Sequence, residues 1–123
     1  MPRAALDYVD AHGLTALSMH KLGAELGVKG MSLYSHVDSK DALLDGIVEA
    51  MWAERELPDT TGMDWRDAPR SYARMLRAII RRHPNAAPLL ANRPVMPVDS
   101  LEVLDRYRRV PLRCGCRESR PRR

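Results

Sequence analysis

The sequence has no phenylalanine, and no stretch of it alternates apolar and polar residues with the two-residue period of a half-buried β-strand. Alanine, leucine, methionine and arginine instead supply most of the positions that favour a helix. We therefore expect an all-α fold. At 123 residues the chain is long enough for one domain or slightly more.

Long apolar runs are also missing, as is a charged-then-apolar signal segment. The sequence therefore predicts a cytoplasmic protein with no membrane partner. The only two cysteines, Cys114 and Cys116, stand one residue apart without further ligands, so free thiols are favoured over a metal site. His20 and His36 likewise have no cysteine or second histidine at ligand spacing. No nucleophile, base and orienting group can be assembled, and no glycine-rich phosphate loop exists, so we expect neither an enzyme nor a cofactor.

Positive charge is scarce over most of the chain. Residues 1–105 hold 12 Lys or Arg against 15 Asp or Glu, whereas residues 106–123 hold 8 against 1. The net charge of +4 therefore comes from the last eighteen residues. It cannot serve as evidence that any earlier segment binds nucleic acid.

Residues 18–40 contain two short helical patterns separated by a turn. Leu22 and Leu26 recur at four-residue spacing behind Ser18, which predicts a helix over about residues 19–26 with a serine N-cap. Gly27 supplies the left-handed conformation that ends a helix, and Val28 is expected to tuck under the turn.

The second helix of this pattern is expected to be about two turns long. Leu33 and Val37 mark its buried side. Its outward residues are expected to be Gly30, Met31, Ser32, Tyr34, Ser35 and His36. Such a short, small and polar face suits insertion into a DNA major groove, so the pattern predicts a helix-turn-helix.

Residues 4–52, and above all ALDYVDAHGLTALSMHKLGAELGVKGMSLYSHVDSKDALLD, resemble the DNA-binding domain of the tetracycline-repressor (TetR) family. Four elements carry the resemblance: the helix ending at HGL, the LSMHKLGAELGV helix and turn, LYSHV, and SKDALLD. The resemblance implies an N-terminal three-helix DNA-binding domain, a long connecting helix and a helical regulatory domain. It further implies a ligand-responsive repressor that binds a palindromic operator in double-stranded DNA as a homodimer.

The resemblance places base contacts at four residues, which are His20, Gly30, Met31 and Ser32. A methionine methyl can pack on a thymine methyl, and a serine hydroxyl can serve any base. This surface is therefore expected to read sequence more weakly than one carrying arginine or glutamine. For His20, simple solvent exposure is the alternative.

Phosphate contacts are expected at Ser18, Lys29, Tyr34, His36 and Lys40. Each has another interpretation that stays open, except Lys40, which rests on the resemblance alone. Ser18 could serve only as a helix cap, Lys29 could be merely solvated, the Tyr34 ring could pack on the first helix, and His36 could cap its own helix.

The remaining helices are expected at residues 3–12, from Ser39 to near Trp52, at 65–82 and at 85–91. The buried stripe of the first is expected to be Ala5, Leu6 and Val9. That of the helix from Ser39 is expected to be Leu44, Ile47, Val48 and Met51. That of the helix at 65–82 is expected to be Trp65, Tyr72, Met75, Leu76 and Ile79. A Pro and Gly linker at 57–62 separates two regions. We assign residues 1–52 to the DNA-binding domain with its connecting helix, 63–107 to a partial regulatory domain and 108–123 to an irregular tail.

WRDAPRSYARMLRAIIRRHPNAAPLLANRP resembles the beginning of the family's regulatory domain. Candidate residues for an effector pocket are Trp52, Met75, Ile79, His83, Leu90 and Asn92, although Trp52 is more typical of a core residue. Leu90 stands where the family's type member has a metal-contacting histidine, which argues against a tetracycline-magnesium site. The effector is therefore an unknown small molecule.

A last helix is expected from about Ser100, but residues 108–123 have no helical period and are rich in arginine. We interpret this tail as out-of-frame translation of a GC-rich gene; a genuine basic tail that binds nucleic acid non-specifically is the rival. Under the first interpretation the dimer helices are missing. The chain would then be a truncated remnant that no longer regulates, or a partner subunit of an intact paralogue.

Overall fold

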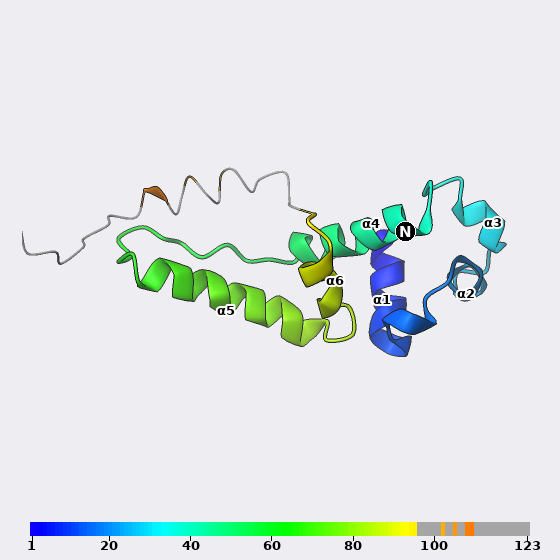
Figure 1. Cartoon of the computed structure of the whole chain (residues 1–123), viewed down its shortest axis with the longest axis horizontal. Coiled ribbons are helices and arrows are strands. Elements are labelled where there is room, and N and C mark those ends of the chain that lie inside the picture. Colours follow the sequence, from blue (N-terminus) through cyan, green and yellow to red (C-terminus); the bar gives the residue numbers. More distant parts are fainter. Residues whose placement is uncertain (96–101, 103–104, 106–107, 110–123) are drawn as a thin grey trace, which may run out of the picture.

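The computed structural model describes residues 1–95 together with residues 102, 105, 108 and 109, and every regular element in this part of the chain is helical. The all-α prediction is confirmed. The elements are α1 (Pro2–His12), a 3₁₀ turn (Leu14–Ala16), α2 (Met19–Glu25), α3 (Gly30–Leu33), α4 (Lys40–Ala53), α5 (Asp67–Arg82) and α6 (Ala87–Asn92). Figure 1 shows α2 and α3 at one end of the molecule, α5 extending away from them, and α1, α4 and α6 between the two.

One hydrophobic cluster runs through α1, α2, α3 and α4. Leu6, Leu22 and Ile47 are fully buried in it, and Leu33 is 2% exposed. A helix as short as α3 cannot hold its conformation alone in water, so the burial of Leu33 fixes it to the rest of the domain. The cluster therefore positions the part of the chain that resembles a DNA-binding unit.

Helix α4 begins where the sequence predicts, because the Ser39 hydroxyl accepts a hydrogen bond from the Ala42 N–H at 3.0 Å. Its inner face differs from the prediction. Leu43 is fully buried, whereas Leu44, expected on the buried stripe, is half-buried. The reason is that α4 packs against both α1 and α6, so its buried surface is wider than one stripe.

Helices α5 and α6 begin later than expected. Helix α5 starts at Asp67, so Trp65 lies half-buried ahead of it, while Met75 and Ile79 are buried as predicted. Helix α6 starts at Ala87, not at residue 85, and carries Pro88 in its first turn. A proline is tolerated in the first turn of a helix but not deeper inside one, which explains the later start.

Several predictions lie outside the described residues: most of the helix expected from Ser100, nearly all of the tail, and both cysteines. The boundaries 63–107 and 108–123 stay predictions. In the described part, no helix has both the length and the hydropathy needed to cross a bilayer.

Candidate nucleic-acid interface

Helix α2 is closed at both ends by local hydrogen bonds. The Ser18 hydroxyl accepts from the Lys21 N–H at 3.2 Å, so its capping role is present. At the other end, Gly27 has a φ of +69°. The Gly27 N–H donates to the Ala24 carbonyl at 3.2 Å, and the next N–H donates to the Gly23 carbonyl at 2.9 Å. These two bonds form a Schellman motif, which confirms the predicted stop.

Helices α2 and α3 touch through backbone at two glycines. A Cβ atom built on Gly23 would lie 2.8 Å from the Val28 carbonyl oxygen and 2.9 Å from the Gly30 Cα and N atoms. A Cβ atom on Gly30 would lie 3.0 Å from the His20 Cα atom. Side chains larger than hydrogen therefore do not fit between the two helices, and the glycine pair sets the separation of α2 and α3.

This close contact explains two wrong predictions about the turn. Leu26 and Val28 were expected to face inward, but they are 40% and 44% exposed. The glycine backbones fill the space between the helices, so these two side chains remain at the surface. The glycines at positions 23 and 30 are the sequence signal for this close approach, although the sequence pattern by itself indicates only a base contact for Gly30.

Helix α3 is shorter than predicted, with four residues in place of two turns. It ends as a turn in which Tyr34 is the C-cap and the Ser35 hydroxyl donates to the Ser32 carbonyl at 2.6 Å. Of the two residues predicted on the inner side, Leu33 is buried and Val37 is half-buried.

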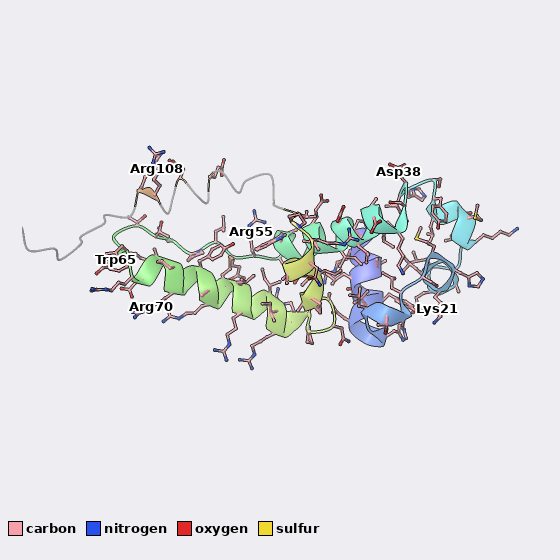
Figure 2. All side chains as sticks on the ribbon, in the orientation of Figure 1. Lys21, Asp38, Arg55, Trp65, Arg70 and Arg108 are labelled. Atoms are coloured by element: carbon pink, nitrogen blue, oxygen red, sulfur yellow. The ribbon has the colours of Figure 1, made fainter. Side chains whose placement is uncertain are left out.

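The structure brings all the predicted DNA-contacting residues together on α2, α3, the start of α4 and the turns that flank α3. Figure 2 shows this end of the molecule between Lys21 and Asp38, far from Trp65 and Arg70. Ser18 and Gly30 are half-buried. The exposed members are His20, Lys29, Met31, Ser32, Tyr34, His36 and Lys40. Their individual contacts with bases or phosphates stay predictions.

A cluster of charged side chains joins α1 and the end of α4 to the end of α5. Glu54 is the C-cap residue of α4, and its carboxylate binds Arg3, Arg82 and His83. The Oε2 atom of Glu54 lies 2.8 Å from both Arg82 Nη1 and His83 Nε2. His83 Nδ1 lies 2.6 Å from Asp10 Oδ2 on α1. One buried histidine therefore bridges carboxylates of α1 and α4.

The charges in this cluster shift two pKa values in opposite directions. Hydrogen bonds from Arg82 and His83 lower the pKa of Glu54 to about 2, although burial opposes the shift. Burial lowers the pKa of His83, but the hydrogen bonds to Glu54 and Asp10 outweigh it, so the net shift is upward. The cluster thus favours a charged carboxylate at Glu54 and a charged imidazolium at His83.

A third contact ties α6 to the beginning of α4. Arg93, the C-cap of α6, donates to Asp45 Oδ1 at 2.6 Å, to the Asp41 carboxylate, and to the Asp41 backbone carbonyl at 3.2 Å. Together with the cluster around Glu54, this contact holds both ends of α4 to the α5–α6 segment. No sequence pattern predicts the contacts of Glu54, Asp10 and Arg93, because charged residues occur throughout the chain and no spacing singles these three out.

Two of the candidate effector-pocket residues line a cavity in the described part of the chain. A cavity of about 300 Å³ lies between the end of α4, the linker and α5. Its lining comprises Glu54, Arg55, Glu56, Pro58, Ser71, Arg74, Met75, Ala78, Ile79 and Arg82. Met75 and Ile79 therefore belong to it.

The other four candidates are not in the lining of this cavity, and their part in an effector site stays a prediction. His83 is buried in the ion-pair cluster described above, and Trp52 and Leu90 pack half-buried against the hydrophobic core. Asn92 is exposed. A hydrophobic sequence pattern does not distinguish residues that line a cavity from residues that pack in the core.

Comparison with known proteins identifies the family. Residues 57–120, more than half of the chain, match the model of the tetracyclin repressor-like C-terminal domain. The chain belongs to the TetR family. The predicted membership is thereby confirmed, and the matched range includes most of the arginine-rich tail.

Relatives of this TetR-family chain include two regulators from actinomycetes. An HTH-type transcriptional regulator of Saccharopolyspora erythraea is 38% identical over 98 residues, covering 80% of this chain and 42% of the relative. The repressor DrrR1 of Streptomyces coeruleorubidus is 36% identical over 104 residues, covering 84% of this chain and 38% of DrrR1. The chain thus spans about two fifths of the length of these relatives.

Solved structures of the family agree in fold. Apo ActR from Streptomyces coelicolor aligns with a TM-score of 0.74 at 31% identity, covering 85% of this chain and 51% of ActR. A TetR variant of Acinetobacter baumannii in complex with minocycline aligns with a TM-score of 0.69 at 30% identity, covering 85% of this chain and 59% of the TetR variant.

Proposed function

We propose that this TetR-family chain acts in transcription regulation by binding double-stranded DNA through α2 and α3. One observation carries the proposal: α3 is a short, exposed helix held rigidly to α2 by the Gly23–Gly30 contact. Its outward side chains are small or capable of hydrogen bonding, which suits a DNA groove. We accordingly assign the chain a binding role and no catalysis, in keeping with the transcriptional regulators it resembles.

We further propose that the protein is a repressor whose DNA binding responds to a small molecule. ActR has been crystallised with actinorhodin, and the Acinetobacter baumannii protein with minocycline. In this chain the cavity between α4 and α5 offers a place for an effector. A ligand that displaced α5 would act on α4 through Glu54, because the Glu54 carboxylate binds Arg82 and His83 at the end of α5.

The proposed operator is palindromic and is bound by a homodimer. Two such units must reach half-sites one helical turn, about 34 to 36 Å, or a multiple of it apart. A single unit would bind with an affinity closer to the non-specific range of roughly 10⁻⁴ to 10⁻⁶ M. Light scattering on the purified chain distinguishes the two cases: a mass of two chains supports the dimeric repressor, and a mass of one chain favours the remnant or partner-subunit alternative.

The DNA-binding proposal is tested by selection from a library of random duplexes with the purified 123-residue chain. We expect enrichment of a defined sequence whose affinity exceeds that of a scrambled duplex at the same salt concentration, since phosphate contacts alone do not discriminate sequences. Equal affinity for selected and scrambled duplexes at every salt concentration would refute sequence-specific binding.

Replacing Tyr34 with phenylalanine is expected to weaken binding to all duplexes by about tenfold or more, because a hydrogen bond to a charged phosphate contributes about 1.5 to 3 kcal/mol. The ring is 45% exposed at the C-cap of α3, so the change should leave the fold intact. Fluorescence anisotropy with the selected and scrambled duplexes measures both affinities. A changed ratio between them would show that Tyr34 reads bases and does not merely bind phosphate.

A further inference from the structure

Helix α5 concentrates positive charge beside the cavity between α4 and α5. From Asp67 to Arg82 it holds five arginines against one aspartate, a balance of +4, whereas residues 1–105 as a whole have a balance of −3. All five arginines are exposed, and two of them, Arg74 and Arg82, line the cavity. Charge of one sign along a cleft raises the local concentration of ligands of the opposite sign. The helix therefore favours an anionic ligand.

Part of the cavity wall is already bonded within the protein. Glu54 Oε2 and Arg82 Nη1 pair at 2.8 Å, and Arg55 Nη1 donates to the Trp52 carbonyl at 2.6 Å. Figure 1 shows the linker that follows α4 running back alongside α5, so these side chains lie where α4, the linker and α5 meet. Their bonds are made before any ligand binds.

Two donors on α5 remain for a ligand. In the described part of the chain, neither the Ser71 hydroxyl nor the Arg74 guanidinium has a hydrogen-bond or ion-pair partner. They are three residues apart, so they are neighbours on one side of the helix. Both groups can donate hydrogen bonds, and the planar fork of a guanidinium matches a carboxylate. Glu56 is an exposed carboxylate of the lining on the linker, so it repels an acidic ligand group towards α5.

The remaining lining is apolar. Met75 and Ile79 are 8% and 2% exposed, and Pro58 and Ala78 complete this surface. The volume of about 300 Å³ is at the lower end of the range for small-molecule sites, about 300 to 1,000 Å³. The sulfur of a methionine also makes favourable contacts with aromatic rings. The cavity thus suits a compact apolar body that carries one acidic group.

We propose, resting on the effector response proposed above, that the effector of this chain is a compact apolar carboxylate. Its carboxylate binds the Arg74 guanidinium and the Ser71 hydroxyl, and its apolar body packs on Met75 and Ile79. Because Arg74 is exposed, its ion pair contributes about fivefold in affinity at most. A neutral molecule of the same shape should bind more weakly by that factor.

The test uses phenylacetate and its neutral amide, phenylacetamide, as two probes with the same apolar body. Each probe is titrated into the 123-residue chain without DNA, and ¹H–¹⁵N NMR gives both the dissociation constant and the residues whose amides shift. We expect phenylacetate to bind the wild type about fivefold more tightly than phenylacetamide, with shifts at Ser71, Arg74 and Ala78. The Arg74→Gln variant should bind the two probes equally.

Arg77→Gln is the matched control for Arg74→Gln. Arg77 is an exposed arginine of the same helix, but it stands outside the lining of the cavity. Both substitutions remove one positive charge, so they separate direct binding of the carboxylate from the general potential of α5. Arg77→Gln should keep the preference for phenylacetate. Because both side chains are exposed, circular dichroism should show the wild-type melting temperature for both variants.

Three results would overturn the proposal. If the two probes bind the wild type equally, or if neither shifts the amides around the cavity, the site does not select an apolar carboxylate. If Arg74→Gln and Arg77→Gln weaken phenylacetate binding to the same extent, the overall charge of α5 causes the preference. These outcomes leave DNA binding untouched, because the duplex selection tests it separately. Phenylacetate that binds as expected but leaves the affinity for the selected duplex unchanged would support the carboxylate site and refute the effector response.

Discussion

Replacing Gly23 with alanine is expected to separate α2 from α3 and to abolish selective DNA binding. The new Cβ atom would lie less than 3.0 Å from three backbone atoms, of Val28 and Gly30, which cannot move as a flexible side chain can. Overpacking costs about 1 to 3 kcal/mol, against a gain of up to about 1 kcal/mol in helix propensity. We expect a net loss of about 1 to 2 kcal/mol in the free energy of unfolding, and a tenfold or larger loss of affinity for the selected duplex as base contacts are displaced.

Gly46→Ala is the matched control for this prediction. Gly46 is also a buried helical glycine, but a Cβ atom there would meet only ring atoms of Pro2, at 3.0 and 3.2 Å. Pro2 lies in the first turn of α1, away from α2 and α3, so we expect DNA affinity to be retained. Urea unfolding and anisotropy on both variants make the comparison. Equal loss of DNA affinity in the two variants would contradict the special role of the Gly23–Gly30 contact.

The second large effect is expected for Glu54→Gln. The Glu54 side chain is 13% exposed and binds three cationic groups from α1 and from the end of α5. Neutralising it leaves His83, which is 3% exposed, without one of its two carboxylate partners. Arg3 and Arg82 are more than half exposed, so their ion pairs with Glu54 contribute little to the free energy of unfolding. We expect Glu54→Gln to lower the free energy of unfolding by roughly 2 to 3 kcal/mol in total. Glu49→Gln, an exposed position on the same helix, is the control and should change little.

The same cluster predicts how stability depends on pH. The pKa of Glu54 is lowered from 4.5 to about 2, so its stabilising contribution is present above pH 4.5 and is lost as the pH falls towards 2. The pKa of His83 is raised above 6.5, so its contribution is present below pH 6.5 and is lost as the pH rises through the raised value. The free energy of unfolding of the wild type, measured across this pH range, should fall both at acid pH (the acid limb) and above the raised pKa of His83 (the alkaline limb). Glu54→Gln should lose the acid limb, and an unchanged acid limb would show that another carboxylate causes it.

The α2–α3 region shows which local features the sequence specifies. Ser18, Gly27 and Ser39 act through their own neighbours along the chain, so the caps and the turn could be predicted from spacing alone. Leu26 and Val28 were placed wrongly because their burial depends on how closely α2 and α3 approach. That distance is set by two glycines far enough apart in sequence to escape a helical-period argument.

The links between the two halves of the chain were less predictable. His83, Glu54 and Asp10 come from three different helices and meet only after α5 has packed against α1 and α4. The hydrophobic pattern places α5 correctly to within two residues, but it carries no information about which charged groups will pair across the boundary. The origin of residues 108–123 stays a prediction.

The most direct test of the central claim is to locate the DNA-binding surface by ¹H–¹⁵N NMR of the 123-residue chain during titration with the selected duplex. We predict that the amide shifts change in the residues from Ser18 to Lys40 and stay constant along α5. Shifts confined to α5 or to the arginine-rich segment beyond residue 105, with Met31 and Tyr34 unaffected, would contradict the claim. The DNA contact would then be a property of basic charge and not of the helix-turn-helix.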